Sequence, residues 1–242
     1  MSLLEIDSVS KSFGGVAALR DVTFTVGANA ILGIMGANGA GKTTLFSLIA
    51  GNERPSRGAI RFGGRRIDGL SPDRVSRSGI ARTYQIVRPL KGLSVAENVT
   101  TAALFGAKPA VNRREAAERG AAILDQLNLA DLADQPAGGI TLSAQKTLEI
   151  AKALATGPRL LLLDEVMAGL TPTEVAGMLE IIRAIKAEYG LTILVIEHVM
   201  RALMELSDWI VVLHHGETIA EGNPAAVAEN PDVQNAYLGH AQ

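Results

Sequence analysis

The 242-residue sequence contains no cysteine and carries almost no net charge. The absence of cysteine excludes disulfides, thiolate nucleophiles and zinc held by cysteine, and it is typical of proteins from a reducing compartment. The formal net charge is only -2 at pH 7. Because there is no bulk positive charge, we expect no nucleic acid among the partners of this chain.

Long hydrophobic runs are also absent. The longest apolar runs, of which residues 160–163 are an example, are much shorter than the ~20 residues that cross a bilayer as a helix. Residues 1–13 alternate polar and apolar side chains, and they lack the basic stretch and the apolar block of a signal peptide. We therefore expect a cytoplasmic protein whose contact with a membrane comes through a partner.

The chain is long enough for one large α/β domain with a sizeable buried core. Residues 3–9 and 22–26 alternate in the manner of half-buried strands, and residues 31–35 form a short apolar run before a glycine-rich turn. This order predicts an antiparallel edge followed by a central parallel strand. Because further strand patterns alternate with helical ones, we predict that the sheet is mostly parallel. These further strand patterns occupy residues 160–163, 191–196 and 210–213.

One helical pattern has a clear start signal. Apolar side chains recur at helical spacing from residue 175 to residue 185. Thr171 is placed to cap this helix, Pro172 fits its first position, and Glu174 completes a capping box. Residues 92–155 contain no convincing strand and are predicted to form several helices. We interpret them as an inserted helical subdomain.

A phosphate-binding loop follows the apolar run at residues 31–35 and precedes an apolar helix predicted at residues 44–50. Its sequence GANGAGKT matches the pattern G-x-x-x-x-G-K-[ST]. Backbone N–H groups of such a loop turn inward around phosphates, and the N-terminus of the following helix adds partial positive charge. Lys42 would reach the β and γ phosphates, and the Thr43 hydroxyl would bind Mg²⁺. The predicted nucleotide-binding residues of the loop are Gly36, Asn38, Gly39, Ala40, Gly41, Lys42, Thr43 and Thr44.

Two adjacent carboxylates, Asp164 and Glu165, follow the apolar run at residues 160–163. The carboxyl ends of parallel strands are where doubly wound sheets bind ligands. An aspartate at this place holds Mg²⁺ in P-loop nucleotide hydrolases, and we predict this role for Asp164. We predict that Glu165 polarises the attacking water. A phosphate loop and an acidic strand end fit many nucleotide hydrolases, so the class depends on the rest of the chain.

Across nearly its full length the chain resembles the ABC ATPase family. Gln85 stands where the family has a glutamine that contacts Mg²⁺ and water, and His198, in the segment VIEHVM, stands at the histidine that contacts the γ-phosphate. Phe13 takes the place of an aromatic residue that stacks on adenine. The resemblance implies ATP and Mg²⁺ as cofactors. It also implies ATP hydrolysis, with Lys42, Glu165 and His198 as the catalytic residues.

The segment that corresponds to the family's L-S-G-G-Q signature departs from that pattern. Judged by its distance from Asp164, the corresponding segment is ITLSA, residues 140–144. Thr141 retains the hydroxyl that the family's serine offers to the γ-phosphate of the opposite subunit's ATP. Leu142 and Ser143 stand where the family has glycines, which implies a looser contact with phosphate. The alternative is an ordinary helix N-terminus, since helix starts favour Thr and Ser.

The expected architecture is a P-loop NTPase core of α/β class, with a mostly parallel sheet, an antiparallel β edge and an inserted α-helical subdomain. A single ABC ATPase domain would span residues 1–242, with the nucleotide-binding core at residues 1–91 and 156–242. The helical subdomain at residues 92–155 would carry the signature segment. The resemblance implies that two ATPase chains, identical or different, enclose two ATP molecules and act on transmembrane permease subunits at the inner face of the cell membrane.

Four segments are similar to the ATP-binding subunits of branched-chain amino acid importers: ARTYQIVRPLKGLSVAENV, DEVMAGLTPTE, IEHVMRALMELSD and NAYLG. This narrower resemblance implies an indirect connection to a solute-binding protein. Three alternatives stay open. They are the ATPase subunit of a lipid or lipopolysaccharide exporter, a soluble ABC ATPase with no transport role, and a regulatory nucleotide-binding protein without useful turnover.

Overall fold

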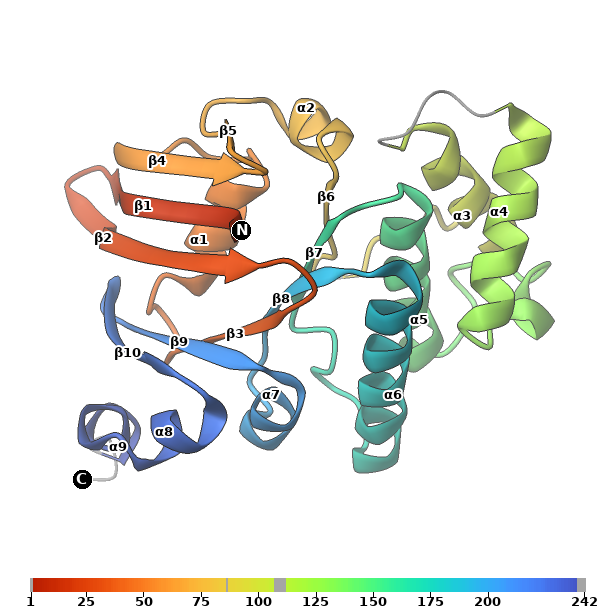
Figure 1. Cartoon of the computed structure of the whole chain (residues 1–242). Coiled ribbons are helices and arrows are strands. Elements are labelled where there is room, and N and C mark those ends of the chain that lie inside the picture. Colours follow the sequence, from red (N-terminus) through yellow and green to blue (C-terminus); the bar gives the residue numbers. More distant parts are fainter. Residues whose placement is uncertain (1, 86, 107–111, 239–242) are drawn as a thin grey trace. The chain divides into compact units, whose positions relative to one another are not determined.

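The computed structural model describes residues 2–85, 87–106 and 112–238 (Figure 1). The chain forms two compact units. The first takes residues 1–75 together with 192–242, and the second takes residues 76–191. The chain passes from the first unit to the second within helix α2 (Pro72–Arg77).

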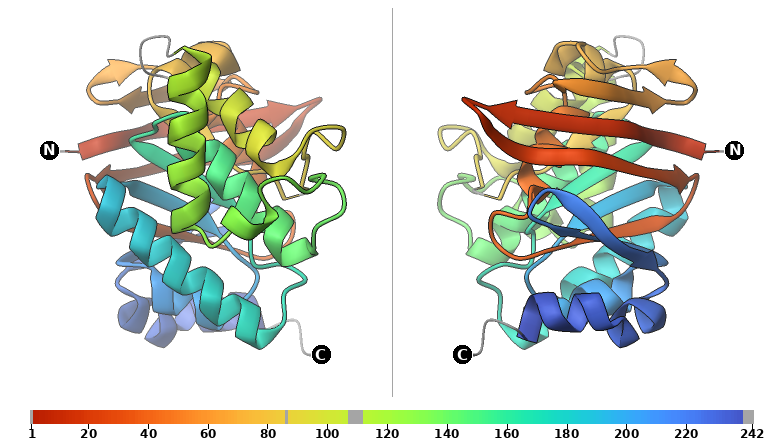
Figure 2. Two further views of the ribbon diagram at one scale, coloured as in Figure 1. Left: turned by 90° about the vertical axis from the view of Figure 1, so that its right-hand side faces the viewer. Right: turned by 90° about the vertical axis from the view of Figure 1, so that its left-hand side faces the viewer.

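An antiparallel sheet forms the N-terminal part of the first unit. Its strand order is β2-β1-β4-β5, and every neighbouring pair is antiparallel. The right-hand view of Figure 2 faces the long strands β1 and β2. These strands confirm the antiparallel edge predicted from the alternation of polar and apolar residues, although both extend beyond the predicted segments. The strands are β1 (Ser2–Phe13), β2 (Val16–Gly27), β4 (Arg57–Phe62) and β5 (Arg65–Arg66).

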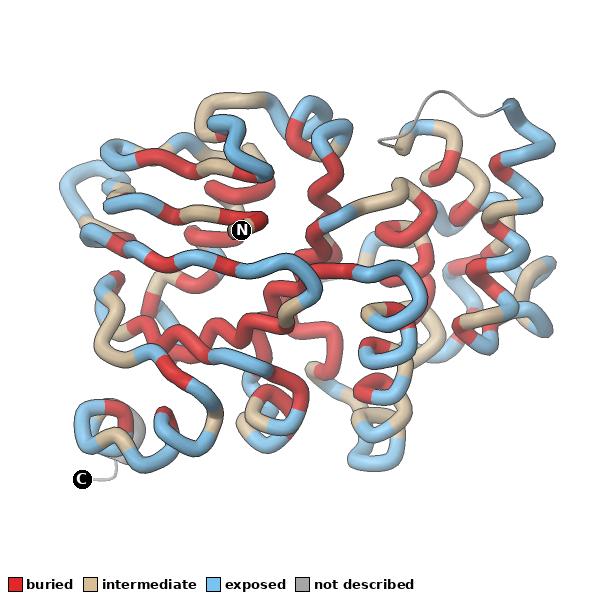
Figure 3. The backbone as a smooth tube through the Cα atoms, in the orientation of Figure 1, coloured by how far each residue is buried: buried red, intermediate tan, exposed pale blue. Residues whose placement is uncertain are grey.

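The first unit also contains three parallel strands. Strand β3 (Ile31–Met35) lies between β8 (Thr192–Ile196) and β9 (Trp209–His214) and runs parallel to both. Every residue of β3 and β8 is buried, which Figure 3 shows as a continuous red tube. Strand β10 (Glu217–Gly222) pairs with β9 in the antiparallel sense. The central parallel strand that the sequence predicts at residues 31–35 is therefore confirmed.

Among the described residues, four helices lie wholly within the first unit. Helix α7 packs against β3, and α8 packs against β9 and β10. Helix α1 starts directly at the end of the glycine-rich loop, two residues earlier than the predicted segment at residues 44–50. The four helices are α1 (Lys42–Ile49), α7 (Met200–Leu206), α8 (Pro224–Glu229) and α9 (Pro231–Leu238).

The second unit pairs two short parallel strands with a group of helices. Strand β6 (Ile80–Arg82) runs parallel to β7 (Leu160–Asp164), with Arg82 opposite Leu162. Helices α3, α4 and α5 pack against one another, and α5 also contacts β6. The left-hand view of Figure 2 shows α4 in front of α3 and α5. The helices are α3 (Val95–Leu104), α4 (Arg113–Gln126), the 3-10 turn η1 (Ala130–Leu132), α5 (Leu142–Ala155) and α6 (Pro172–Tyr189).

The helical character predicted for residues 92–155 agrees with this pattern. The described residues of that stretch hold α3, α4, η1 and α5, and none of them belongs to a named strand. The compact unit that contains these helices is larger, since it runs from residue 76 to residue 191 and includes β6, β7 and α6. A subdomain bounded at residues 92 and 155 therefore stays a prediction.

The predicted start of α6 is present in atomic detail. Thr171 Oγ1 accepts a hydrogen bond from the Glu174 backbone N–H at 3.4 Å, and the Thr171 backbone N–H donates to Glu174 Oε2 at 2.8 Å. Pro172 occupies the first helical turn, and Gly190 ends the helix with φ of 59°. The hydrogen bonds from Thr171 hold the pKa of the Glu174 carboxyl below its ordinary value. The carboxylate is therefore favoured near the positive end of the helix.

Candidate nucleotide-binding and catalytic site

The glycine-rich loop joins β3 to α1 in the first unit. A Cβ on Gly36 would lie 2.5 Å from the Leu213 carbonyl oxygen, so only glycine fits there without a shift of backbone. Gly41 has φ of 101°, and a Cβ on it would lie 2.6 Å from the Ala18 carbonyl oxygen. Both glycines are thus required by close backbone approach and, at Gly41, by the left-handed conformation as well. The loop ends directly at the N-terminus of α1, where backbone N–H groups favour anions.

Lys42 is the first residue of α1 and is buried. Its Nζ donates to the carbonyl oxygens of Gly36 at 2.6 Å and Ala37 at 3.0 Å, so the ammonium group lies inside the curve of the loop. Phosphate oxygens are stronger acceptors than these carbonyls because the hydrogen bond is then between two charged groups. Thr43 is exposed beside Lys42, which leaves its hydroxyl accessible to a ligand.

Two further predicted residues belong to the first unit. His198 is exposed and comes two residues after the end of β8. Phe13 ends β1 and is 45% exposed, with Lys11 Nζ 4.6 Å from the centre of its ring. An exposed aromatic ring at a strand end is able to stack on a planar ligand. The adenine and γ-phosphate contacts of these two residues stay predictions.

The predicted acid pair lies in the second unit, at the end of β7. Asp164 and Glu165 are both buried, at 2% and 6% exposed. Asp164 Oδ2 accepts a hydrogen bond from Arg82 Nη2 at 2.6 Å, and the two side chains are 3% and 8% exposed. The other carboxylate oxygen, Oδ1, is buried and has no hydrogen-bond partner. A buried carboxylate oxygen without a partner fits the residue predicted to hold Mg²⁺.

Gln85 and Glu165 are brought together in the second unit. Gln85 Nε2 donates to Glu165 Oε2 at 2.6 Å. Lys146, from α5, donates from its Nζ to the Glu165 backbone carbonyl at 2.7 Å. Gln85, the glutamine singled out by the family resemblance, therefore contacts the carboxylate predicted to act on water.

Arg82 and Lys146 are not among the site residues predicted from the sequence. Their partners lie 82 and 19 residues away along the chain, and no short motif records such a contact. A weak signal exists for Lys146, because it stands in a helix whose following residues are mostly apolar. A cation in such a stretch calls for a buried partner.

Thr141 is the N-cap of α5, and its Oγ1 accepts from the Ala144 backbone N–H at 3.3 Å. Thr141 and Leu142 are both exposed. The helix begins at Leu142. Thr141 therefore caps the helix, as the alternative of an ordinary helix N-terminus predicts. An exposed cap at a helix N-terminus also leaves N–H groups available to an anion.

The acidic and imidazole groups of the described residues form no cluster of three that could hold a metal by itself. Mg²⁺ bound with a nucleotide needs few protein ligands, because phosphate oxygens and water complete its octahedron. Thr43 belongs to the first unit and Gln85 and Asp164 to the second, so the Mg²⁺ ligand set predicted from the sequence stays a prediction. No helix among the described residues is long and apolar enough to cross a membrane.

The α/β fold with a phosphate loop between β3 and α1 defines a P-loop nucleotide-hydrolysing protein. The family description "ABC transporter" matches residues 19–168, and "Branched-chain amino acid ATP-binding cassette transporter" matches residues 217–242. The chain belongs to the ABC transporter family, whose activity is ATP hydrolysis. The family and the fold predicted from the sequence are thereby confirmed.

Curated relatives match along nearly the whole chain. The high-affinity branched-chain amino acid transport ATP-binding protein BraF of Pseudomonas aeruginosa is 38% identical, over 99% of this chain and 98% of that protein. The corresponding protein LivG of Escherichia coli is 36% identical over the same shares. Among solved structures, an ABC-transporter cassette in its ADP conformation superposes with a TM-score of 0.91. The two sequences are 30% identical, and the superposition covers 99% of this chain and 100% of that chain.

Proposed function

We propose that this chain is the ATP-hydrolysing subunit of a membrane transporter that imports branched-chain or related amino acids. The relatives named for branched-chain amino acid transport support this proposal, as does the match of residues 217–242 to the importer description. Both favour import over the lipid or lipopolysaccharide export that the sequence left open. The observation that carries the ATPase role is the phosphate loop with Lys42 Nζ inside its curve.

Different residues of the chain would bind the phosphates, the adenine and the Mg²⁺. In this proposal the backbone N–H groups of the loop and the Lys42 ammonium bind the β and γ phosphates, and Phe13 stacks on adenine. Thr43, Gln85 and Asp164 would hold Mg²⁺, which would supply positive charge against the phosphates. Asp164 is suited to this because Arg82 holds Oδ2 while Oδ1 has no hydrogen-bond partner.

Hydrolysis needs a positioned water and charge stabilisation rather than a covalent intermediate. Glu165 orients and polarises the water, and His198 contacts the γ-phosphate. Gln85 donates to Glu165 Oε2. The glutamine that would contact Mg²⁺ would therefore also fix the direction of the Glu165 carboxylate. Lys42 stabilises the charge that develops on the transferred phosphoryl group.

We further propose that the working unit contains two ATPase chains, identical or different. Thr141, at the start of α5, would contact the γ-phosphate of the ATP held by the opposite chain. The pair would lie on the inner face of the cell membrane against transmembrane permease subunits, and a solute-binding protein would take part only indirectly. If the two chains differ, changes at Thr141 and Leu142 should impair the partner's nucleotide site and leave this chain's own site intact.

To test the proposal, the chain is produced together with its candidate permease subunits, and the purified complex is reconstituted into proteoliposomes. Expected are Mg²⁺-dependent ATP turnover and amino acid uptake that starts on addition of a loaded solute-binding protein. The matched control is Lys42→Ala, which should abolish both signals. ATP turnover that drives release of lipid and leaves amino acids untouched would support the exporter instead. No turnover with or without the permease would support the regulatory alternative.

A further inference from the structure

Lys146 is a lysine held inside the protein. It lies in the second turn of α5 and is 4% exposed, in a stretch where every residue from 146 to 151 is buried. A buried ammonium group is costly unless it is hydrogen-bonded. Its Nζ donates to the backbone carbonyl of Glu165 at 2.7 Å. The contact joins α5 to the residue that directly follows β7.

The backbone at Glu165 needs such support. Its φ is 52°, in the left-handed region that residues with a Cβ rarely adopt. The same Glu165 carbonyl accepts a second hydrogen bond from the Ala168 backbone N–H at 3.2 Å. Lys146 supplies the charged donor of the two, and hydrogen bonds from charged donors are the stronger kind.

The carboxylate direction follows from this backbone conformation. Glu165 Oε2 accepts from Gln85 Nε2 at 2.6 Å, so the residue is held at its side chain and at its carbonyl. Release of the carbonyl would let the backbone leave the left-handed region, and the carboxylate would turn with it. A catalytic group displaced by about 1 Å can lose about 10²-fold in rate.

We propose that Lys146 is a positioning residue for Glu165. It holds the Glu165 backbone in the left-handed conformation, and so fixes the carboxylate that acts on water. Lys146 lies five positions after Thr141, the N-cap of the same helix. It therefore links the end of α5 that would meet the opposite chain's nucleotide to the carboxylate of this chain's own site. This inference rests on the proposed role of Glu165 in hydrolysis.

The test compares single-turnover ATP hydrolysis by the full chain and its Lys146→Met variant. The variant should lose about 10²-fold in the hydrolysis rate, with the KM for ATP unchanged because the phosphate loop is untouched. Lys146→Arg keeps a charged donor and should retain most of the rate. The matched control is Lys152→Met in the same helix, whose Nζ bonds Glu149 Oε1 at 2.8 Å and the Arg88 carbonyl at 3.1 Å.

A merely structural role is separated from positioning by a double-mutant cycle. If Lys146 acts through Glu165, adding Lys146→Met to Glu165→Gln leaves the residual rate of Glu165→Gln unchanged. An equal further loss in that background would overturn the inference, and so would a Lys146→Met rate equal to that of Lys152→Met. If Lys146→Met does not fold, Lys146→Gln takes its place in both comparisons. Wild-type turnover by Glu165→Gln alone would instead refute the proposed role of Glu165.

Discussion

Arg82→Met removes the charged partner of a buried carboxylate. Arg82 Nη2 and Asp164 Oδ2 are 2.6 Å apart, and the two side chains are only 8% and 3% exposed. Loss of one member of a buried ion pair leaves an uncompensated charge and typically costs about 3–5 kcal/mol. Native domains are stable by roughly 5–15 kcal/mol. The substitution should therefore remove a large part of the free energy of unfolding.

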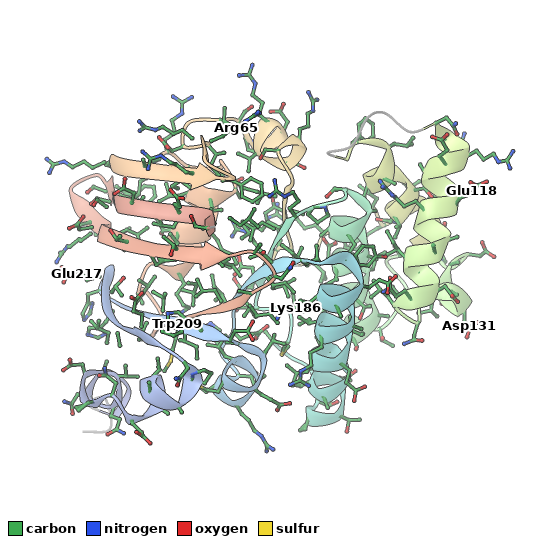
Figure 4. The ribbon with its side chains drawn as sticks, in the orientation of Figure 1. Arg65, Glu118, Asp131, Lys186, Trp209 and Glu217 are labelled. Atoms are coloured by element: carbon green, nitrogen blue, oxygen red, sulfur yellow. The ribbon has the colours of Figure 1, made fainter. Side chains whose placement is uncertain are left out.

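Urea unfolding of the full chain, followed by circular dichroism, measures this loss. The matched control is Arg114→Met, which breaks an ion pair with Glu118 whose members are 88% and 63% exposed. Figure 4 labels Glu118 on α4. An exposed pair at this helical spacing contributes only about 0.3–0.5 kcal/mol, so the control should unfold almost as the wild type does.

The double variant Arg82→Met with Asp164→Asn separates charge from packing. Because it carries no buried charge at this position, it should recover stability relative to Arg82→Met alone. If Arg82→Met cost less than about 1 kcal/mol, the range of an ordinary exposed pair, the reasoning from burial would be refuted. The same conclusion would follow if the double variant were no more stable than the single one.

Three further predictions concern single residues. Gly41→Ala forces a Cβ to within 2.6 Å of the Ala18 carbonyl oxygen at a φ of 101°, which distorts the phosphate loop. The free energy of ATP binding, measured by calorimetry, should weaken by at least roughly 1–3 kcal/mol, the cost of a strained backbone. Thr171→Ala removes the cap of α6 and should cost about 1 kcal/mol in urea unfolding, whereas Thr171→Ser should cost little. Burial alone would raise the pKa of Asp68, but hydrogen bonds from Arg66 and a backbone N–H outweigh it and hold that pKa below its ordinary value. The stabilisation from this carboxylate is therefore present above its unfolded pKa of about 3.9 and is lost as pH falls toward the folded pKa. Asp68→Asn should flatten that part of the stability profile, and an unchanged profile would contradict the assignment.

Strong local patterns predicted the central elements well. The apolar run at residues 31–35 has the same bounds as β3, and the run at residues 160–163 falls one residue short of β7. The cap of α6 was predicted from Thr171 and Glu174 because a capping box lies within four consecutive residues. Signals of this kind depend only on neighbours in sequence, so the elements that they specify can be predicted without knowledge of the tertiary structure.

Weakly patterned strands were missed. Strand β4 has the sequence RGAIRF and β10 has ETIAEG, and neither shows a clear alternation of polar and apolar residues. Strand β4 is defined by its antiparallel pairing with β1, which runs from Leu4 to Ser10 with one irregularity, and β10 by its pairing with β9. Pairing of this kind depends on distant segments and leaves no local signature.

The candidate site divides in the same way. The phosphate loop, Asp164 and Glu165 were predicted because motif and context coincide, and Gln85, His198 and Phe13 were predicted through the family resemblance. The hydrogen bonds of Arg82 and Lys146 to the acid pair could not be predicted, since they join β6 and α5 to the end of β7. Structure thus added the residues that hold the predicted carboxylates in place.

The role of Glu165 is tested most directly by ATP turnover of Glu165→Gln. The substitution keeps the shape of the side chain and removes its ability to accept a proton. Turnover at saturating MgATP should fall by about 10²–10⁴-fold, the usual contribution of a general base, while ATP binding measured by calorimetry stays at the wild-type affinity. Wild-type turnover by this variant in the assembled transporter would contradict the assignment of Glu165 as the residue that activates water.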